Sequence, residues 1–207
     1  MRVLLPLAAG LMILATTACQ KPAGAAGALP DDMTMGSPTA KVTMVEYASV
    51  ACPHCARFNN EVFPAFKAKY IDTGKVRYVA REALTGDPAI AAAGFLTARC
   101  AGKDKYFEVV NAIYRAQDQI ETSGSPHAML LTIARSAGLT DPQFEACITD
   151  ETALKALEAR WERYATQDKI LGTPTFVING KVYGKGEMTL PELDAAIADA
   201  QSGKPAS

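Results

Sequence analysis

The sequence has little excess charge of either sign. Its 21 lysines and arginines nearly balance 22 aspartates and glutamates, for a formal net charge of −1, so no global field attracts nucleic acid or acidic lipid. Cysteine is also scarce: five residues are too few for a disulfide scaffold, and their odd number leaves at least one without an intramolecular partner. With 207 residues, 49% of them hydrophobic, the chain can bury one ordinary core, or a core with an insertion, but not several. A basic binding protein, a disordered tail and a large multidomain machine are thereby excluded.

The first residues have the layout of a secretory signal peptide. Arg2 precedes an apolar run over residues 3–14, and small residues follow up to Cys19. The run is too short to cross a bilayer, and no later segment is long and apolar enough to do so. Its end also resembles a bacterial lipobox, in which Cys19 becomes a lipidated first residue, although Thr16 stands where leucine is preferred. Plain cleavage, after residue 18 or near residues 26–28, is the alternative.

Either route removes Cys19 from the cysteines that can pair, which leaves an even four. Residues 20–40 are rich in Ala, Gly and Pro, a composition that predicts a flexible tether or a poorly ordered start. We expect residues 1–28 to be a leader and its tether and the remaining chain to be exported, with lipid anchoring through Cys19 left open.

The mature chain opens with a predicted strand, helix and strand. Residues 41–47, KVTMVEY, are apolar and β-branched enough for a buried strand. A helix of about five turns follows and ends before residues 73–74. Its apolar stripe repeats every four residues, at Phe58, Val62, Phe66 and Tyr70. Residues 75–82 form the second strand, so a right-handed crossover is expected.

The rest of the chain carries helical signals and then a hairpin. Residues 87–170 contain helix caps before prolines, including a capping box at residues 140–143, and apolar positions at helical spacing. Strand character returns at residues 175–178, and Asn179-Gly180 predicts a hairpin. A second capping box, at residues 189–192, opens a last helix to about residue 200. The sequence therefore predicts an α/β fold, a mixed sheet flanked by helices with an inserted all-helical domain. The expected boundaries are 29–86 and 172–207 for the two parts of the sheet domain and 87–171 for the insertion.

A Cys-Pro-His-Cys motif lies where the first strand meets the first helix. Cys52 and Cys55 are three positions apart, with Pro53 between them, so both thiols lie on one side of the first helical turn and can form a reversible disulfide. Free backbone N–H groups and the positive end of the helix dipole stabilise a thiolate there, which predicts a lowered pKa for Cys52. His54 adds a donor beside that sulfur. A stabilised thiolate is a good leaving group, so the motif predicts a strong oxidant.

A structural disulfide and a zinc site are the alternatives for this motif. A bridge within one helical turn closes almost no loop and adds little stability through chain entropy. Zinc needs further ligands, and the remaining nitrogen and sulfur donors are His54, His127, Cys100 and Cys147. We therefore predict a redox-active disulfide that works without a metal or another cofactor.

Together with the later segment Gly172-Thr173-Pro174-Thr175-Phe176, the motif resembles the DsbA branch of the thioredoxin superfamily over nearly all of the mature chain. The resemblance implies a thioredoxin-like fold with a helical insertion. It also implies a cis Pro174 facing the redox pair and a Thr173 backbone that pairs with a substrate strand. Glu46 matches the family's buried acid, which would have a raised pKa and relay the proton of Cys55. A carboxylate at the margin of the sheet is the alternative for Glu46.

Two further cysteines lie in the predicted insertion. A bridge between Cys100 and Cys147 would close a loop of about 48 residues, worth at most about 4 kcal/mol in the chain-entropy model. Certain DsbA relatives carry a second, non-catalytic disulfide in their helical domain, and two buried free thiols are the alternative.

The basic residues of the mature chain predict no nucleic-acid stripe. We assign four of them to solvated faces: Lys67, Lys69, Arg77 and Arg81. His127 is assigned to a solvated helix start and carries no predicted role.

By this resemblance the chain is a monomeric periplasmic enzyme that introduces disulfides into secreted proteins with free thiols. A DsbB-like membrane quinone reductase would reoxidise it. Thr173 also precedes this proline in isomerase relatives, so a disulfide isomerase or reductase for few clients stays open. A non-enzymatic metallochaperone using Cys52, His54 and Cys55 is the alternative from another class, although no methionine-rich or third cysteine ligand lies nearby.

Overall fold

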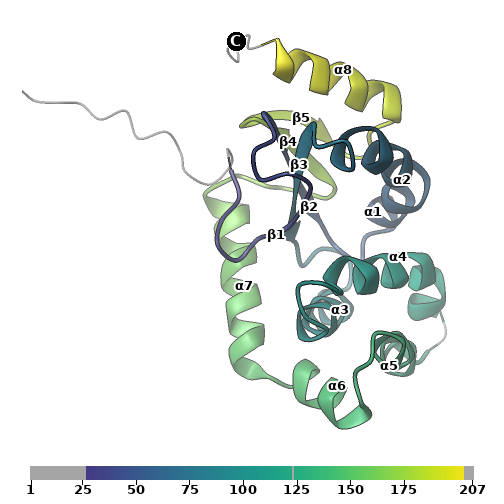
Figure 1. Ribbon diagram of the computed structural model, residues 1–207. Coiled ribbons are helices and arrows are strands. Elements are labelled where there is room, and N and C mark those ends of the chain that lie inside the picture. Colours follow the sequence, from purple (N-terminus) through teal and green to yellow (C-terminus); the bar gives the residue numbers. More distant parts are fainter. Residues whose placement is uncertain (1–26, 123, 203–207) are drawn as a thin grey trace, which may run out of the picture.

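The computed structural model describes residues 27–122 and 124–202 (Figure 1). A five-stranded mixed sheet has the order β1-β3-β2-β4-β5. The strands are β1 (Met33–Met35), β2 (Val42–Ala48), β3 (Val76–Glu82), β4 (Thr175–Ile178) and β5 (Lys181–Lys185). The pair β2 and β3 is parallel, as the strand-helix-strand prediction requires, and the other neighbouring pairs are antiparallel. The predicted hairpin of β4 and β5 is confirmed.

The helix after β2 is continuous but not a regular α-helix. It runs through α1 (Pro53–Arg57), η1 (Phe58–Val62), α2 (Phe63–Phe66) and η2 (Lys67–Ile71). In η1 the N–H of Phe63 bonds to the carbonyl of Phe58, five residues back, and the next residue, Pro64, has no N–H to donate. A stripe repeating every four residues drifts around a helix of 3.6 residues per turn, and the wider π turns keep it on one face.

Five helices follow before the sheet resumes. They are α3 (Pro88–Cys100), α4 (Tyr106–Thr122), α5 (Pro126–Ser136), α6 (Asp141–Ile148) and α7 (Glu151–Thr166), and α8 (Leu190–Gln201) ends the described chain. The capping boxes predicted at Thr140 and Thr189 are both formed. Helices α3 to α6 bury an apolar core that also includes Cys52, Cys55 and Ala56 of the motif region, and α7 returns along the sheet (Figure 1). The mixed sheet with a helical insertion is thus confirmed, while the boundaries at 87 and 171 stay a prediction.

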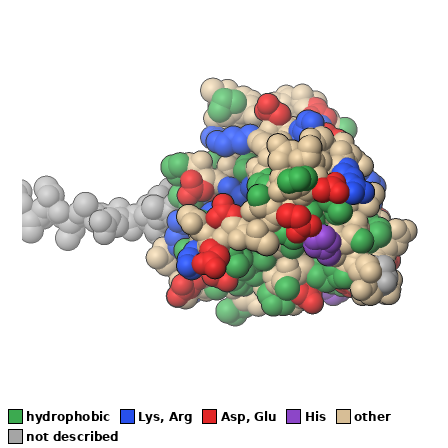
Figure 2. Space-filling view, turned by 90° about the horizontal axis from the view of Figure 1, so that it is seen from below, with side chains coloured by type: hydrophobic (Ala, Val, Ile, Leu, Met, Phe, Trp, Pro, Cys, Tyr) green, Lys and Arg blue, Asp and Glu red, His purple; other side chains and the backbone are tan. Residues whose placement is uncertain are grey.

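Along β2 the side chains alternate between two apolar layers. Met44 faces the redox-motif helix and α8, whereas Val45 and Tyr47 face α7. Acidic and basic side chains are interspersed on the face that Figure 2 shows. Among the helices within residues 27–122 and 124–202, none has both the length and the apolar character needed to span a bilayer.

Two predictions from the sequence are wrong. Part of the expected tether is ordered, because β1 pairs with β3 and places Asp32 in the interior. Arg81 is not solvated but 1% exposed. It lies on the α7 face of β3, forms ion pairs at 3.2 Å with Asp32 and Asp168, and donates to the hydroxyl of Tyr47 at 2.6 Å. A buried guanidinium is tolerated there because the two carboxylates compensate its charge.

Candidate redox site

The loop from β2 into α1 is held tightly before it reaches the motif. The N–H of Cys52 donates to the carbonyl of Ser49 at 3.1 Å, and the Ser49 hydroxyl donates to the carbonyl of Thr85 at 2.7 Å. Gly86 passes so close that a Cβ there would lie 2.1 Å from the carbonyl oxygen of Ala51. The backbone from two sides thus fixes Cys52 as the N-cap residue of α1.

The two cysteines of the motif differ in depth. Both are free thiols, and Pro53 occupies the first turn of α1 between them. Cys52 is 7% exposed and Cys55 is 0% exposed. Both side chains belong to the core of the helical part. Only Cys52 keeps some exposed surface, so it is the one that a thiolate from another molecule can reach.

Their acidities are pushed in opposite directions. The pKa of Cys52 is lowered from its ordinary 9.0 to about 5, first by a hydrogen bond from the Cys55 thiol and then, against the effect of burial, by Thr173 and by the backbone N–H groups of Cys55 and His54. The pKa of Cys55 is raised well above its ordinary value, first by burial and then by its bond to the Cys52 sulfur. The helix N-terminus contributes as the sequence predicts, but the neighbouring thiol contributes more. The pair holds its remaining proton on Cys55.

The loop before β4 completes the wall around the outer sulfur. The Thr173–Pro174 peptide bond is cis. The carbonyl of Thr173 lies 3.4 Å from Sγ of Cys52, and its hydroxyl is 2.6 Å from that of Thr85. Because β4 pairs with β2, the sheet itself brings the segment at 173 to the segment at 52. Nothing local in the sequence marks Thr85 as part of this wall.

Glu46 lies beneath the motif on the central strand β2. It is buried and accepts a hydrogen bond from the hydroxyl of Tyr78 at 2.7 Å. Burial raises its pKa to about 7, against the lowering effect of Tyr78 and with a further rise from the Cys52 charge. A cavity of about 20 Å³ borders both side chains, room for one water molecule. The interpretation of Glu46 as a carboxylate at the sheet margin is wrong, and the proton-relay role stays a prediction.

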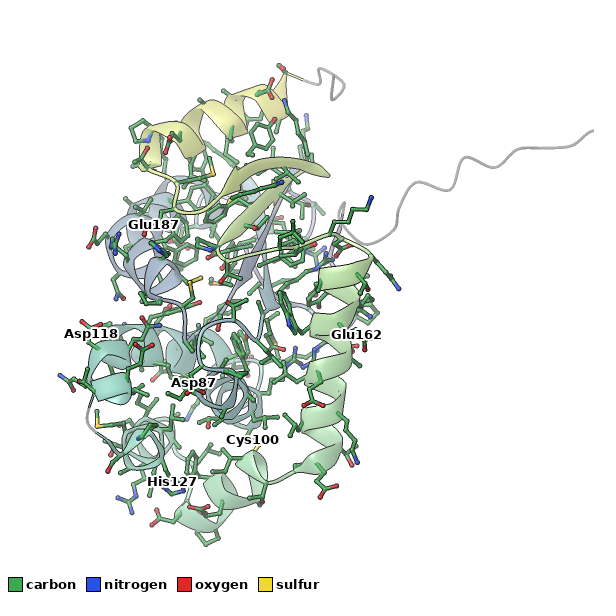
Figure 3. All side chains as sticks on the ribbon, turned by 180° about the vertical axis from the view of Figure 1, so that it is seen from behind. Asp87, Cys100, Asp118, His127, Glu162 and Glu187 are labelled. Carbon is green, nitrogen blue, oxygen red and sulfur yellow. A yellow bond between two sulfur atoms is a disulfide. The ribbon has the colours of Figure 1, made fainter. Side chains whose placement is uncertain are left out.

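The side chain of His54 does not contact the sulfur. Its Nδ1 is 2.5 Å from Oε1 of Glu187, and the same oxygen accepts from Arg57 at 2.9 Å. The imidazole is 63% exposed, so only the backbone of His54 acts on Cys52. Figure 3 shows Glu187 beside the redox-motif helix. It comes from the segment between β5 and α8, and a partner 133 residues away carries no signal in the sequence.

The second cysteine pair is a disulfide. Cys100 and Cys147 are bonded with their Cα atoms 6.2 Å apart, and they join the C-terminal ends of α3 and α6. In Figure 3, Cys100 lies well apart from Glu187 and hence from the motif. The two buried free thiols considered for this pair are not what the structure contains.

The other residues singled out in the sequence lie away from the motif or outside the described residues. His127 pairs with Glu145 at 2.8 Å on the surface of the helical part. Cys19 and its leader lie outside the described residues. In the part of the chain that the structure describes, no three His, Cys, Asp or Glu side chains gather as metal ligands would.

Sequence comparisons point to one group of proteins. A family model described as thioredoxin matches residues 28–199. A Rickettsia typhi protein whose name describes it as a protein-disulfide oxidoreductase is 34% identical over 151 residues, which cover 72% of this chain and 55% of that protein. The chain thus spans about half the length of such curated relatives.

Two further likenesses are to Dsb proteins. The thiol:disulfide interchange protein DsbL of Escherichia coli is 25% identical over 174 residues, covering 76% of this chain and 77% of that one. The crystal structure of alpha-DsbA1 from Wolbachia pipientis matches 84% of this chain and 93% of its own with a TM-score of 0.76 and 27% identity. The family model and these likenesses agree with the site: the chain belongs to the thioredoxin family, with the helical insertion of its DsbA-like members.

Proposed function

We propose that this protein is a thiol-disulfide oxidoreductase whose Cys52–Cys55 disulfide is donated to client proteins. One observation carries the proposal: the less deeply buried sulfur, that of Cys52, has a lowered pKa and is paired with the fully buried sulfur of Cys55, whose pKa is raised. Two groups whose surroundings push their pKa values apart are typical of a catalytic pair.

The first step exchanges one sulfur–sulfur bond for another. A client thiolate attacks Sγ of Cys52 in the disulfide form, a mixed disulfide forms, and the Cys52–Cys55 bond breaks. Cys55 leaves, and its high pKa makes it a poor leaving group unless a proton arrives with the electron pair. Glu46, with a pKa of about 7, is suited to supply that proton near neutral pH.

The second step releases the client. A second client thiolate attacks the client sulfur of the mixed disulfide, a disulfide forms within the client, and Cys52 leaves as a thiolate. Its pKa of about 5 makes it a good leaving group. Two electrons have passed from the client to the protein, which is left with Cys52 as thiolate and Cys55 as thiol.

The direction of electron transfer follows from the stabilised Cys52 thiolate. It favours the reduced protein, so the disulfide form is a strong oxidant. Clients would be unfolded or partly folded exported proteins with free thiols. A DsbB-like membrane quinone reductase would reoxidise the enzyme, and the protein would act as a monomer in the periplasm, with or without a lipid anchor at Cys19. An isomerase or reductase is the alternative within the class. A metallochaperone is less supported, because Nδ1 of His54 is already bound to Glu187.

The redox potential of the Cys52–Cys55 pair, measured in glutathione buffers, separates these functions. An oxidase should lie well above the value of about −270 mV known for thioredoxin, and purified disulfide form should oxidise a dithiol peptide stoichiometrically. A potential near that of thioredoxin would make the protein a reductase. Tight metal binding by the reduced form, with no peptide oxidation, would favour the metallochaperone.

A further inference from the structure

Two large hydrophobic side chains are strongly exposed among the described residues, and both lie on one groove. Leu171 is 89% exposed and Val182 is 47% exposed. They line a depression of about 500 Å³ between residues 168–173 and strand β5. Single exposed apolar residues are ordinary on a protein surface, but two that share a groove indicate a binding surface.

The groove shares Thr173 with the wall around the outer sulfur. Thr173 lines it, and the carbonyl of the same residue lies 3.4 Å from Sγ of Cys52. A client whose sulfur reaches Cys52 therefore brings its neighbouring residues beside Thr173. Val182 pairs with Val177, so the groove lies on the sheet face that α7 covers and is separate from the Glu187 side of the motif.

The rim of the groove carries exposed positive charge. Lys169 and Lys185 line it and are exposed. Asp168 also lines it, but its carboxylate already accepts from Arg81 and from the hydroxyl of Tyr47. An approaching segment thus meets an apolar floor and two lysines, which favours a carboxylate on the client.

We propose that this groove is the docking site for the residues flanking the client cysteine. Its occupant is an extended client segment with a large apolar side chain close to the cysteine and an acidic residue beyond it. The proposal rests on the proposed function and names the class of segment that the enzyme prefers. Leu171 and Val182 supply the apolar contact, and Lys169 and Lys185 supply the charge contact.

The test uses three dithiol peptides that differ only beside the reactive cysteine. One carries leucine and glutamate, one carries serine and glutamate, and one carries leucine and lysine. Burial of one leucine side chain is worth about a factor of ten in binding, so the disulfide form of the full chain should oxidise the first peptide with about a tenfold higher kcat/KM than the second. The third should be slower than the first, and increasingly so at low salt.

Variants assign this preference to the groove. Leu171→Gln should remove the preference for leucine, whereas Leu171→Met, which keeps an apolar side chain of similar size, should retain it. Lys185→Glu should abolish the charge preference, because the new carboxylate cancels the charge of Lys169. Lys103→Glu, on the loop between α3 and α4, should leave the preference unchanged. The redox potential of the Cys52–Cys55 pair should be equal in all four variants, which separates docking from chemistry.

Equal oxidation of all three peptides by the wild-type chain, or preferences unchanged by Leu171→Gln and Lys185→Glu, would overturn the docking site while leaving the proposed function intact. Self-association that Leu171→Gln abolishes would also overturn it, since a second copy would then occupy the groove. If the wild-type chain oxidises no peptide at all, the proposed function itself fails.

Discussion

The two cysteine pairs of this chain differ in their separation along the sequence and in their surroundings. Cys52 and Cys55 share one helical turn and are buried, and their pKa values are displaced in opposite directions. Cys100 and Cys147 are separated by 47 positions and bridge the ends of two helices. A bond within one turn restricts the unfolded chain very little, so the first pair is suited to chemistry, whereas the second closes a long loop and is suited to stability.

The two cysteine pairs should differ most strongly in their importance for activity. Cys52→Ser should abolish oxidation of a dithiol peptide, because the sulfur that clients attack is removed, whereas the double variant Cys100→Ser/Cys147→Ser should remain active. Cys55→Ser, incubated with the disulfide form of the same peptide, should accumulate a mixed disulfide, because the Cys52 thiolate attacks the peptide disulfide and releases one peptide thiolate. The product is detectable as added mass that dithiothreitol removes. Activity that survives Cys52→Ser would contradict the assignment of the attacked sulfur.

The two cysteine pairs should also differ in their contribution to the stability of the fold. Loss of the Cys100–Cys147 bridge should lower the free energy of unfolding by up to about 4 kcal/mol in the chain-entropy model, measured by urea denaturation without reductant. Reduction of the Cys52–Cys55 pair in the same double variant should not lower it further, because that pair closes almost no loop. Equal stability of the wild type and the double variant would show that the second bridge has another purpose.

A smaller effect concerns the proton that Cys55 needs. Glu46 has a raised pKa of about 7, so it holds a proton below pH 7 and loses it above. Mixed-disulfide formation should be about 10- to 100-fold faster in the wild type than in Glu46→Gln near pH 6, since general-acid catalysis is worth at least that range. The ratio should fall as pH rises through 7. The control Glu61→Gln, at an exposed carboxylate on η1, should keep the wild-type dependence of the rate on pH. If Glu46→Gln also keeps the wild-type dependence, Glu46 relays no proton.

The smallest effect concerns the carboxylate beside His54. Glu187→Gln removes the negative charge that is bound to His54 of the motif. Loss of its repulsion should stabilise the Cys52 thiolate and raise the redox potential by about 10 to 30 mV, given that 30 mV corresponds to about 1.4 kcal/mol for this couple. The effect should be smaller in a His54→Ala background, because His54 joins Glu187 to the motif. Glu162→Gln, on α7 and away from the motif (Figure 3), should leave the potential unchanged. An unchanged or lower potential in Glu187→Gln would contradict this electrostatic role.

Local signals predicted most of the fold. Three kinds of feature depend on only a few consecutive residues, and the structure places each where the sequence indicates. They are the capping boxes at Thr140 and Thr189, the hairpin at Asn179-Gly180 and the motif at the start of α1. Proline at position 64 was the available sign that the long helix departs from regular geometry.

What the sequence could not show depends on partners far along the chain. The strand β1 has three residues and forms because β3 offers an edge. Arg81 is buried because Asp32 and Asp168 reach it from 49 and 87 positions away. Glu187 reaches His54 by the same kind of distant contact. Neither hydrophobic periodicity nor motif spacing predicts contacts between residues so far apart in the sequence.

The proposed oxidising power depends on the acidity of the Cys52 thiol in the reduced protein. Thiolate absorbance at 240 nm, followed through pH in the reduced protein with Cys52→Ser as the blank, should show a midpoint of about 5. The reduced protein should also lose stability relative to Cys52→Ser as pH falls toward that midpoint, because a lowered pKa stabilises the folded state only while the sulfur is ionised. A midpoint near 9, the ordinary value for a cysteine, would leave the oxidising power without a source and contradict the account.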